Sequence, residues 1–309
     1  MVYGQHCRCG WNFSRSASGR RAEALQRNHG RNGISGLAFD LDHVGIFGDD
    51  VNQLADLWRR MGFHVVGPAE LEAVDDEGDL QPIGQQSAHV MFADHYLELT
   101  SVTHPKPGHH LERFFDAPKG LRLILLNSSD IEKDQAFCAD TGLNPGDVHN
   151  AARKLEYGEC GTARFRWFGL PDAQFPDALV CFVEHLTPER VFDSAQCQHA
   201  NTASRLTRLG WVGDRIPENY QRLEGTAGNR ESTQVETLPP SEMGRLLKTP
   251  RTDLSPWAVL GINVHDPDSL KRLLEENGVP FETHGSRTVV QPDATGGLLL
   301  VFESLVGSC

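Results

Sequence analysis

The sequence predicts an α+β protein built from four βαβββ-type modules that pair into curved, mostly antiparallel sheets. Two observations lead to this prediction. A strand, an acidic turn and an amphipathic helix occur near the start of the chain and again near its end, where VGIFGDDVNQL and LGINVHDPDSL align without a gap. Two weaker copies lie between them, so the chain reads as a series of repeated units.

The four predicted modules cover residues 39–102, 119–187, 203–250 and 257–305. In the first, FDLDHVGIF alternates as a strand does. Apolar residues then follow at helical spacing from Val51 to Met61, and Gly62 ends the helix. The third module is degenerate, because the polar stretch 225–256 hardly supports strands. One module cannot bury both faces of its sheet. Two modules side by side are therefore expected to place helices outside and a ligand cavity inside.

The predicted organisation has three parts. Residues 1–36 form a basic arm that we expect to be disordered, residues 37–197 hold modules one and two, and residues 198–309 hold modules three and four. The formal net charge of −13 argues against a nucleic-acid partner, and the apolar runs are too short to span a membrane. The seven cysteines form no disulfide framework, which favours a cytoplasmic protein.

Strand alternation indicates which polar residues face the predicted cavity. His43 lies on the first strand, and Tyr96 and Glu98 share one face of the fourth. In the second module, Glu184 shares a face with apolar residues such as Phe182. A carboxylate in such surroundings needs a metal or a cationic partner, because an unpaired buried charge is costly.

Four stretches carry a resemblance to a known family: LDHVGIFGDDVNQLADLWRRMGF, HYLELTSV, QHANTASRL and VVQPDATGGLLLVFES. Over residues 37–305 the chain resembles the vicinal oxygen chelate superfamily, which includes glyoxalase I, bleomycin-resistance proteins and extradiol dioxygenases. Within it, the sequence is most similar to the glyoxalase-like-domain proteins. The resemblance implies the fold more strongly than the reaction, since one fold hosts many activities.

The resemblance also implies a metal site, because metal-binding members take ligands from the first and last strands of a module. The corresponding residues here are His43, Glu98 and Glu184. Their donor atoms suit a divalent ion such as Zn, Mn, Ni or Fe(II). Leu123 departs from this pattern, since it stands where a fourth ligand is expected. In the second half Glu303 alone is of ligand type, so we expect that half to be structural.

The function expected from these residues is that of a metal-assisted lyase or isomerase acting on a small oxygenated carbonyl compound in the first half. The predicted catalytic residues and metal ligands are His43, Glu98 and Glu184. The predicted substrate contacts are His199, Asn201, Tyr96 and His89. No nucleotide cofactor is expected, because the phosphate-binding glycine motifs are absent.

Several alternatives stay open. A ring-cleaving Fe(II) dioxygenase needs two histidines and a carboxylate, so His199 would have to join His43. A metal-free enzyme would use His43 as its base and Glu98 to orient it. A metal-free protein of the bleomycin-resistance type would only sequester a small molecule. His109 and His110 are expected in a solvated loop, and the sequence leaves open whether the protein is a homodimer.

Overall fold

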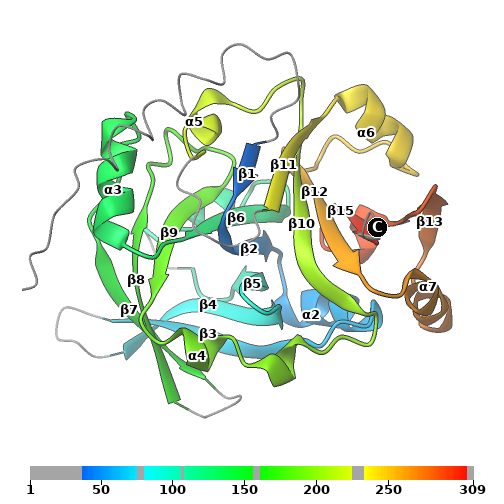
Figure 1. The fold of residues 1–309 in the computed structure, drawn as a ribbon, viewed down its shortest axis with the longest axis horizontal. Coiled ribbons are helices and arrows are strands. Elements are labelled where there is room, and N and C mark those ends of the chain that lie inside the picture. Colours follow the sequence, from blue (N-terminus) through cyan, green and yellow to red (C-terminus); the bar gives the residue numbers. More distant parts are fainter. Residues whose placement is uncertain (1–36, 75–79, 106–107, 156–160, 225–232, 305–309) are drawn as a thin grey trace, which may run out of the picture. The chain divides into compact units, whose positions relative to one another are not determined.

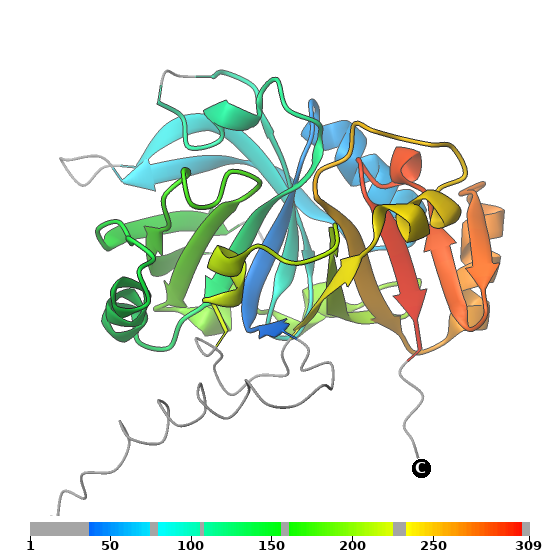
Figure 2. The same cartoon turned by 90° about the horizontal axis from the view of Figure 1, so that it is seen from above.

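The computed structural model describes residues 37–304 except 75–79, 106–107, 156–160 and 225–232. The predicted N-terminal arm lies outside the described residues. The described residues fall within one compact unit, whose strands form two curved sheets (Figure 1 and Figure 2). The α+β class predicted from the sequence is confirmed.

The first sheet has eight strands in the order β3-β4-β5-β2-β6-β9-β8-β7. Its first module consists of β2 (Leu41–Phe47), α2 (Val51–Arg60), β3 (Val66–Val74), β4 (Leu80–Met91) and β5 (Tyr96–Val102). Its second consists of β6 (Gly120–Asn127), α3 (Ile131–Asp140), β7 (His149–Leu155), β8 (Gly161–Gly169) and β9 (Leu179–His185). In each module the first and last strands pair in parallel, and β2 joins the two by pairing antiparallel with β6.

The second sheet has seven strands in the order β1-β11-β10-β12-β15-β14-β13. Its strands are β1 (Leu37–Phe39), β10 (Ala203–Val212), β11 (Thr233–Leu238), β12 (Trp257–Val264), β13 (Phe281–His284), β14 (Arg287–Val290) and β15 (Leu299–Glu303). Its helices are α5 (Glu218–Gln221), α6 (Pro240–Leu246) and α7 (Pro267–Glu276). Short helical turns elsewhere are η2 (Glu112–Phe114), α4 (Pro188–Val191), η3 (Ser194–Cys197) and η4 (Pro292–Ala294).

The third module is reduced to its outer strands. β10 and β11 pair in parallel, as the first and last strands of the other modules do. Between them the described part of the chain contains no further strand. β1 pairs antiparallel with the other edge of β11, the position that β4 takes beside β5. The predicted degeneracy is therefore a loss of middle strands, and the start of the compact unit replaces one of them.

Acidic residues begin the longest helices of the described chain. Asp50 precedes α2 and accepts from the amide of Asn52, and Asp266 precedes α7 and accepts from the amide of Ser269. These bonds satisfy amides that have no partner within the helix. Gly62, with φ of 84°, lies just beyond the end of α2, where a left-handed residue is favoured. None of the described helices is long and apolar enough to cross a bilayer.

The two sheets share one hydrophobic core, which leaves the inner face of the first sheet to a cavity. Val44 of β2, Leu260 of β12 and Trp58 of α2 all belong to one buried cluster. Nε1 of Trp58 also donates to the carbonyl of Thr295, 3.1 Å away in the second half. The edges of the first sheet curl together, so that Lys154 Nζ of β7 lies 3.6 Å from Oε1 of Glu72 on β3.

Candidate functional site

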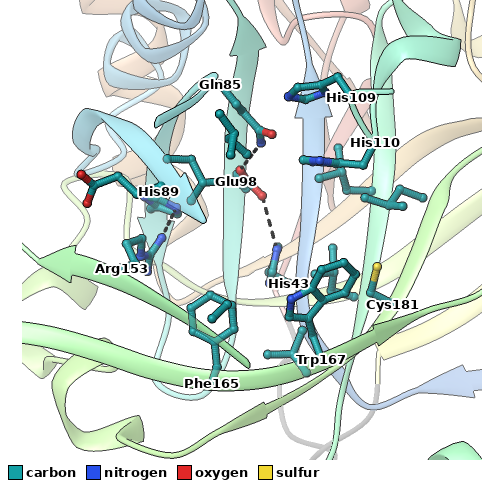
Figure 3. Close-up of a pocket in the computed structure, with 18 of the residues that line it drawn as sticks. His43, Gln85, His89, Glu98, His109, His110, Arg153, Phe165, Trp167 and Cys181 are labelled. Atoms are coloured by element: carbon teal, nitrogen blue, oxygen red, sulfur yellow. Dashed lines mark hydrogen bonds and ion pairs between the residues drawn. The ribbon is translucent and has the colours of Figure 1, made fainter. Parts of the chain in front are cut away.

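A cavity of about 510 Å³ lies on the inner face of the first sheet, and both of its modules line it. Apolar atoms make up most of the lining surface, including those of Leu125 of β6 and of Phe165 and Trp167 of β8. A group of polar side chains projects into it from β2, β4 and β5 (Figure 3). This combination of an apolar wall with a few converging polar groups is typical of small-molecule sites.

A β-bulge in β2 brings two neighbouring side chains together. Leu41 pairs with Leu126 and His43 with Leu125, so Asp42 is an additional residue with no partner in the register of β6. In a regular strand the side chains of Asp42 and His43 would point to opposite faces. Here Nδ1 of His43 lies 2.6 Å from Oδ1 of Asp42, and the two groups form a hydrogen bond. Bulges commonly re-aim side chains in this way beside active sites.

Four ionisable side chains contact one another in sequence through the bulge, and we call them the buried chain: His185, Asp42, His43 and Glu98. Nε2 of His185 donates to Oδ2 of Asp42 at 2.7 Å, and Nε2 of His43 lies 3.3 Å from Oε2 of Glu98. The other Glu98 oxygen accepts from Ser87 Oγ at 2.5 Å. Each of the four ionisable side chains is less than 9% exposed. Two β-strands, β2 and β5, thus place a histidine and a carboxylate in contact at the cavity wall.

The opposite charges in the buried chain stabilise one another and offset the cost of removing each from water. Burial alone would lower the pKa of His43, but its hydrogen bonds to Asp42 and Glu98 raise it above its ordinary value. Burial would raise the pKa of Glu98, yet contact with His43 lowers it to about 2. The pKa of Asp42 is likewise far below its usual range, because His185 and His43 outweigh the effect of burial. The favoured state is therefore an imidazolium between two carboxylates.

Tyr96 and His89, two of the predicted substrate contacts, line the cavity beside this chain. The ring of Tyr96 stacks on that of His43 with 4.2 Å between centroids. Nε2 of His89 accepts from Arg153 NH1 at 2.6 Å. Burial and the charge of Arg153 hold the pKa of His89 well below its ordinary value, so this imidazole is neutral.

Glu184 does not join His43 and Glu98, contrary to our prediction. β9 lines the cavity through alternate residues that include Cys181 and His185, so Glu184 lies on the opposite face. Its carboxylate accepts from Nε of Arg166 at 2.7 Å, and Arg166 also pairs with Glu132 of α3. Glu184 thus belongs to a contact between sheet and helix.

His199 and Asn201 are bonded to backbone in the connection between the halves and do not line the cavity. Nε2 of His199 donates to the carbonyl of Met91, and its Nδ1 accepts from the amide of His64. Asn201 donates to the carbonyl of Met61, where α2 ends. The prediction that these two residues contact substrate is not supported by their positions.

Two histidines that we expected in a solvated loop lie in such a loop, with His110 exposed, and they also line the cavity. His109 and His110 follow β5 and stack on each other with 4.4 Å between ring centroids. Figure 3 shows them on the side of the cavity opposite His89 and Arg153. The polar groups at the cavity wall are therefore more numerous than the sequence analysis indicated.

The residues present do not fit the predicted metal ion. Among the described residues, no group of three or more His, Cys, Asp or Glu side chains is arranged to hold one. His43 and Glu98 are bonded to each other, and Leu123 occupies a wall position. Burial raises the pKa of the Cys181 thiol on β9 to about 12. We therefore derive no step through a metal.

In the second sheet, side chains occupy the region that corresponds to the cavity of the first sheet. Because Gly261 pairs with Val301 as Gly45 pairs with Glu98, the counterpart of Glu98 is Val301 and not Glu303. Glu303 binds Arg208 NH2 at 2.9 Å. Apolar residues of β12 and β15 join Met243 and Leu247, at the α6 end of the sheet, in a separate buried cluster.

Comparison with known proteins identifies the class. Residues 41–226 match the family model described as a glyoxalase-like domain, so the chain belongs to that family. This match confirms the resemblance to the vicinal oxygen chelate superfamily inferred from the sequence, and it spans both modules of the first sheet.

Solved structures are similar to this chain at low sequence identity. A hypothetical protein from Staphylococcus aureus has 10% identity and a TM-score of 0.55, over 86% of this chain and 99% of that one. A methylmalonyl-CoA epimerase variant from Streptomyces coelicolor has 20% identity and a TM-score of 0.33, over 48% and 99%. A homoprotocatechuate 2,3-dioxygenase variant from B. fuscum has 13% identity and a TM-score of 0.43, over 88% and 73%. No curated protein matches the chain.

Proposed function

We propose that this protein is an enzyme that transfers a proton on a small carbonyl compound, as an isomerase, an epimerase or a lyase does. The observation that supports this proposal is the buried chain of His185, Asp42, His43 and Glu98, which ends at the wall of an otherwise mainly apolar cavity. Buried ionisable groups with strongly shifted pKa values cluster at catalytic sites. A region that served only for packing would not be stabilised by buried charged groups.

Asp42 and His185 act as positioning residues in this proposal. The Asp42 carboxylate accepts the Nδ1 proton of His43, which fixes the ring and directs Nε2 toward Glu98. His185 holds the second oxygen of Asp42 at 2.7 Å, so that the carboxylate cannot turn away. The carboxylate also stabilises the positive charge of His43, as a buried aspartate does for histidine in other enzymes.

His43 and Glu98 are the proposed acid and base. A substrate carbonyl oxygen would accept a hydrogen bond from Nε2 of His43, and Glu98 would remove the proton from the adjacent carbon. The imidazolium then stabilises the enolate oxygen as its negative charge develops. Displacement of the contact between His43 and Glu98 by substrate makes the carboxylate more basic, because that contact lowers its pKa.

A sequestering protein is the second candidate, since aromatic and aliphatic side chains dominate the cavity wall. A ring-cleaving Fe(II) dioxygenase is less well supported. His199 is bonded to backbone, and Nε2 of His89 is engaged with Arg153, so neither supplies the second histidine of an iron site.

The proposal is tested by exchange of carbon-bound hydrogen with solvent deuterium, followed by NMR over a panel of small ketones and 2-oxo acids. The protein is treated with a chelator, and His43→Gln and Glu98→Gln are compared with Glu303→Gln as a matched control. We expect wild type and the control to catalyse exchange. The two site variants should lose about 100-fold or more, as expected when a catalytic acid or base is removed.

Other outcomes decide between the candidates. Stoichiometric binding without exchange of any compound in the panel would indicate a sequestering protein. Activity that appears only after addition of Zn, Mn, Ni or Fe(II) would contradict metal-independent proton transfer. Exchange that survives in both His43→Gln and Glu98→Gln would place the chemistry elsewhere.

A further inference from the structure

Arg153 is a cation at the cavity wall that the proposed proton transfer does not use. It lies on β7, is partly buried, and lines the cavity. Its NH1 donates to His89 at 2.6 Å, and its guanidinium carbon lies 5.9 Å from the centroid of the Tyr96 ring. Neither of these partners is a carboxylate, so neither balances the charge of the arginine.

The carboxylates near Arg153 in the described part of the chain face other cations. Glu98 faces His43 at 3.3 Å, and Glu72 faces Lys154 at 3.6 Å. Within those same described residues, no carboxylate lies at ion-pair distance from Arg153. A guanidinium facing a largely apolar cavity without a counter-ion favours an anionic group from a ligand, because two N–H donors of its planar fork match a carboxylate.

We propose that Arg153 forms a carboxylate-binding subsite, and that the ligand is a small carboxylic acid with an apolar or aromatic body. This inference rests on the proposed function, since it names the substrate class of the same cavity. His89 positions the guanidinium by accepting one of its N–H groups. The side chains of Phe165 and Trp167 provide the wall for the apolar body (Figure 3).

The subsite lies close to the proposed acid and base. His89 pairs with Glu98 across β4 and β5, so the two side chains project from neighbouring positions on the same face. The Tyr96 ring contacts both His89 and His43, at 5.4 Å and 4.2 Å between centroids. A carboxylate at Arg153 therefore places the carbon next to it near His43 and Glu98, which favours 2-oxo acids over long-chain acids.

The experiment uses two probes that differ in one group. 2-Oxo-4-phenylbutanoate carries a carboxylate where 4-phenylbutan-2-one carries a methyl group, and both have an exchangeable CH₂ beside the carbonyl. Dissociation constants are measured by calorimetry for wild type, Arg153→Gln, Arg153→Lys and the control Arg164→Gln, whose exposed arginine lies on the adjacent strand β8. Thermal unfolding of each variant shows whether it is folded.

We expect wild type to bind the acid more tightly than the ketone, and Arg153→Gln to weaken acid binding by about 10-fold to 100-fold, as loss of a charged hydrogen bond does. Ketone binding should change little, and Arg153→Lys should restore part of the preference. Equal acid affinity in wild type and folded Arg153→Gln would overturn the subsite, and so would a wild type that binds neither probe.

Deuterium exchange at the CH₂ group separates this inference from the proposed function. Acid binding that depends on Arg153, without exchange, would retain the subsite and contradict proton transfer. Exchange of both probes at equal rates, unchanged in Arg153→Gln, would retain proton transfer and overturn the subsite.

Discussion

The two sheets are built from the same module and differ in what occupies their inner faces. In the first, His43, Tyr96 and Glu98 lie on paired first and last strands and line a cavity. In the second, the same pairing places Val259, Leu299 and Val301 in one apolar cluster with residues near α6. A few side chains at matching positions on two paired strands therefore distinguish a module that forms a site from one that forms a core.

The largest expected effect comes from the bulge residue that distinguishes the first sheet. Asp42→Asn removes the charge that holds His43 in position and stabilises its positive form. We expect turnover to fall about 100-fold to 10,000-fold, the range for a disabled acid–base catalyst. Steady-state kinetics on whichever compound shows exchange measures this. A turnover number within a few-fold of wild type would mean that Asp42 only supports the fold.

The next largest effect, on stability, is expected at a glycine that occurs at the same aligned position in both sheets. A Cβ atom on Gly45 would lie 2.8 Å from Leu123, and one on Gly261 would lie 2.7 Å from Cβ of Arg208. We expect Gly45→Ala and Gly261→Ala each to lower the free energy of unfolding by about 1–3 kcal/mol through overpacking. Urea denaturation measures both. A cost at Gly261 alone would show that the first sheet relaxes into its cavity.

The pH dependence of stability should report on the paired charges of the first sheet, His43 and Glu98. His43 has an ordinary pKa of 6.5 that is raised in the native state, so its contribution is complete below pH 6.5 and is lost as the pH rises through the raised value. The pKa of Glu98 falls from 4.5 to about 2, so its contribution is present above pH 4.5 and is lost toward pH 2. Unfolding at a series of pH values should show both losses in wild type, and a combined His43→Gln and Glu98→Gln variant should show them reduced, because Asp42 keeps its contact with His185. Parallel profiles would contradict the paired charges.

The smallest expected effect is at Glu184, which lies outside the cavity. Glu184→Gln weakens its contact with the partly exposed Arg166, which keeps Glu132 as a second partner. We expect a loss of less than about 1 kcal/mol, as for most exposed ion pairs, and unchanged turnover. A loss of turnover as large as that of Glu98→Gln would return Glu184 to the site.

The modules could be predicted from the sequence because hydrophobic periodicity and acidic helix starts are local signals. His43, Tyr96 and Glu98 followed from strand alternation and from the resemblance, and His89 from its place on the strand before Glu98. Asp42 could not be predicted, because a bulge depends on the register with β6, which the sequence of β2 does not specify.

Other errors have equally physical causes. The face of β9 was chosen wrongly because LVCFVEH is apolar on both sides, as expected of a strand covered on both faces, so alternation did not select His185 over Glu184. His109 and His110 lie in the expected loop, but their place at the cavity wall depends on the tertiary path of that loop. The position of His199 could not be predicted, since its backbone partners, such as Met91, are distant in sequence.

The three-residue strand β1 has a consequence for how this protein can be divided or recombined. β1 ends at Phe39 and belongs to the second sheet, whereas β2 begins at Leu41 and belongs to the first. Asp40 is therefore the only residue that connects the two strands. A gene fragment that ends after β9 would carry away the outer strand of the other half and leave the edge of β11 open. The dependence runs in one direction: the second half needs a strand that precedes the first half in the sequence, whereas all strands of the first sheet lie between β2 and β9.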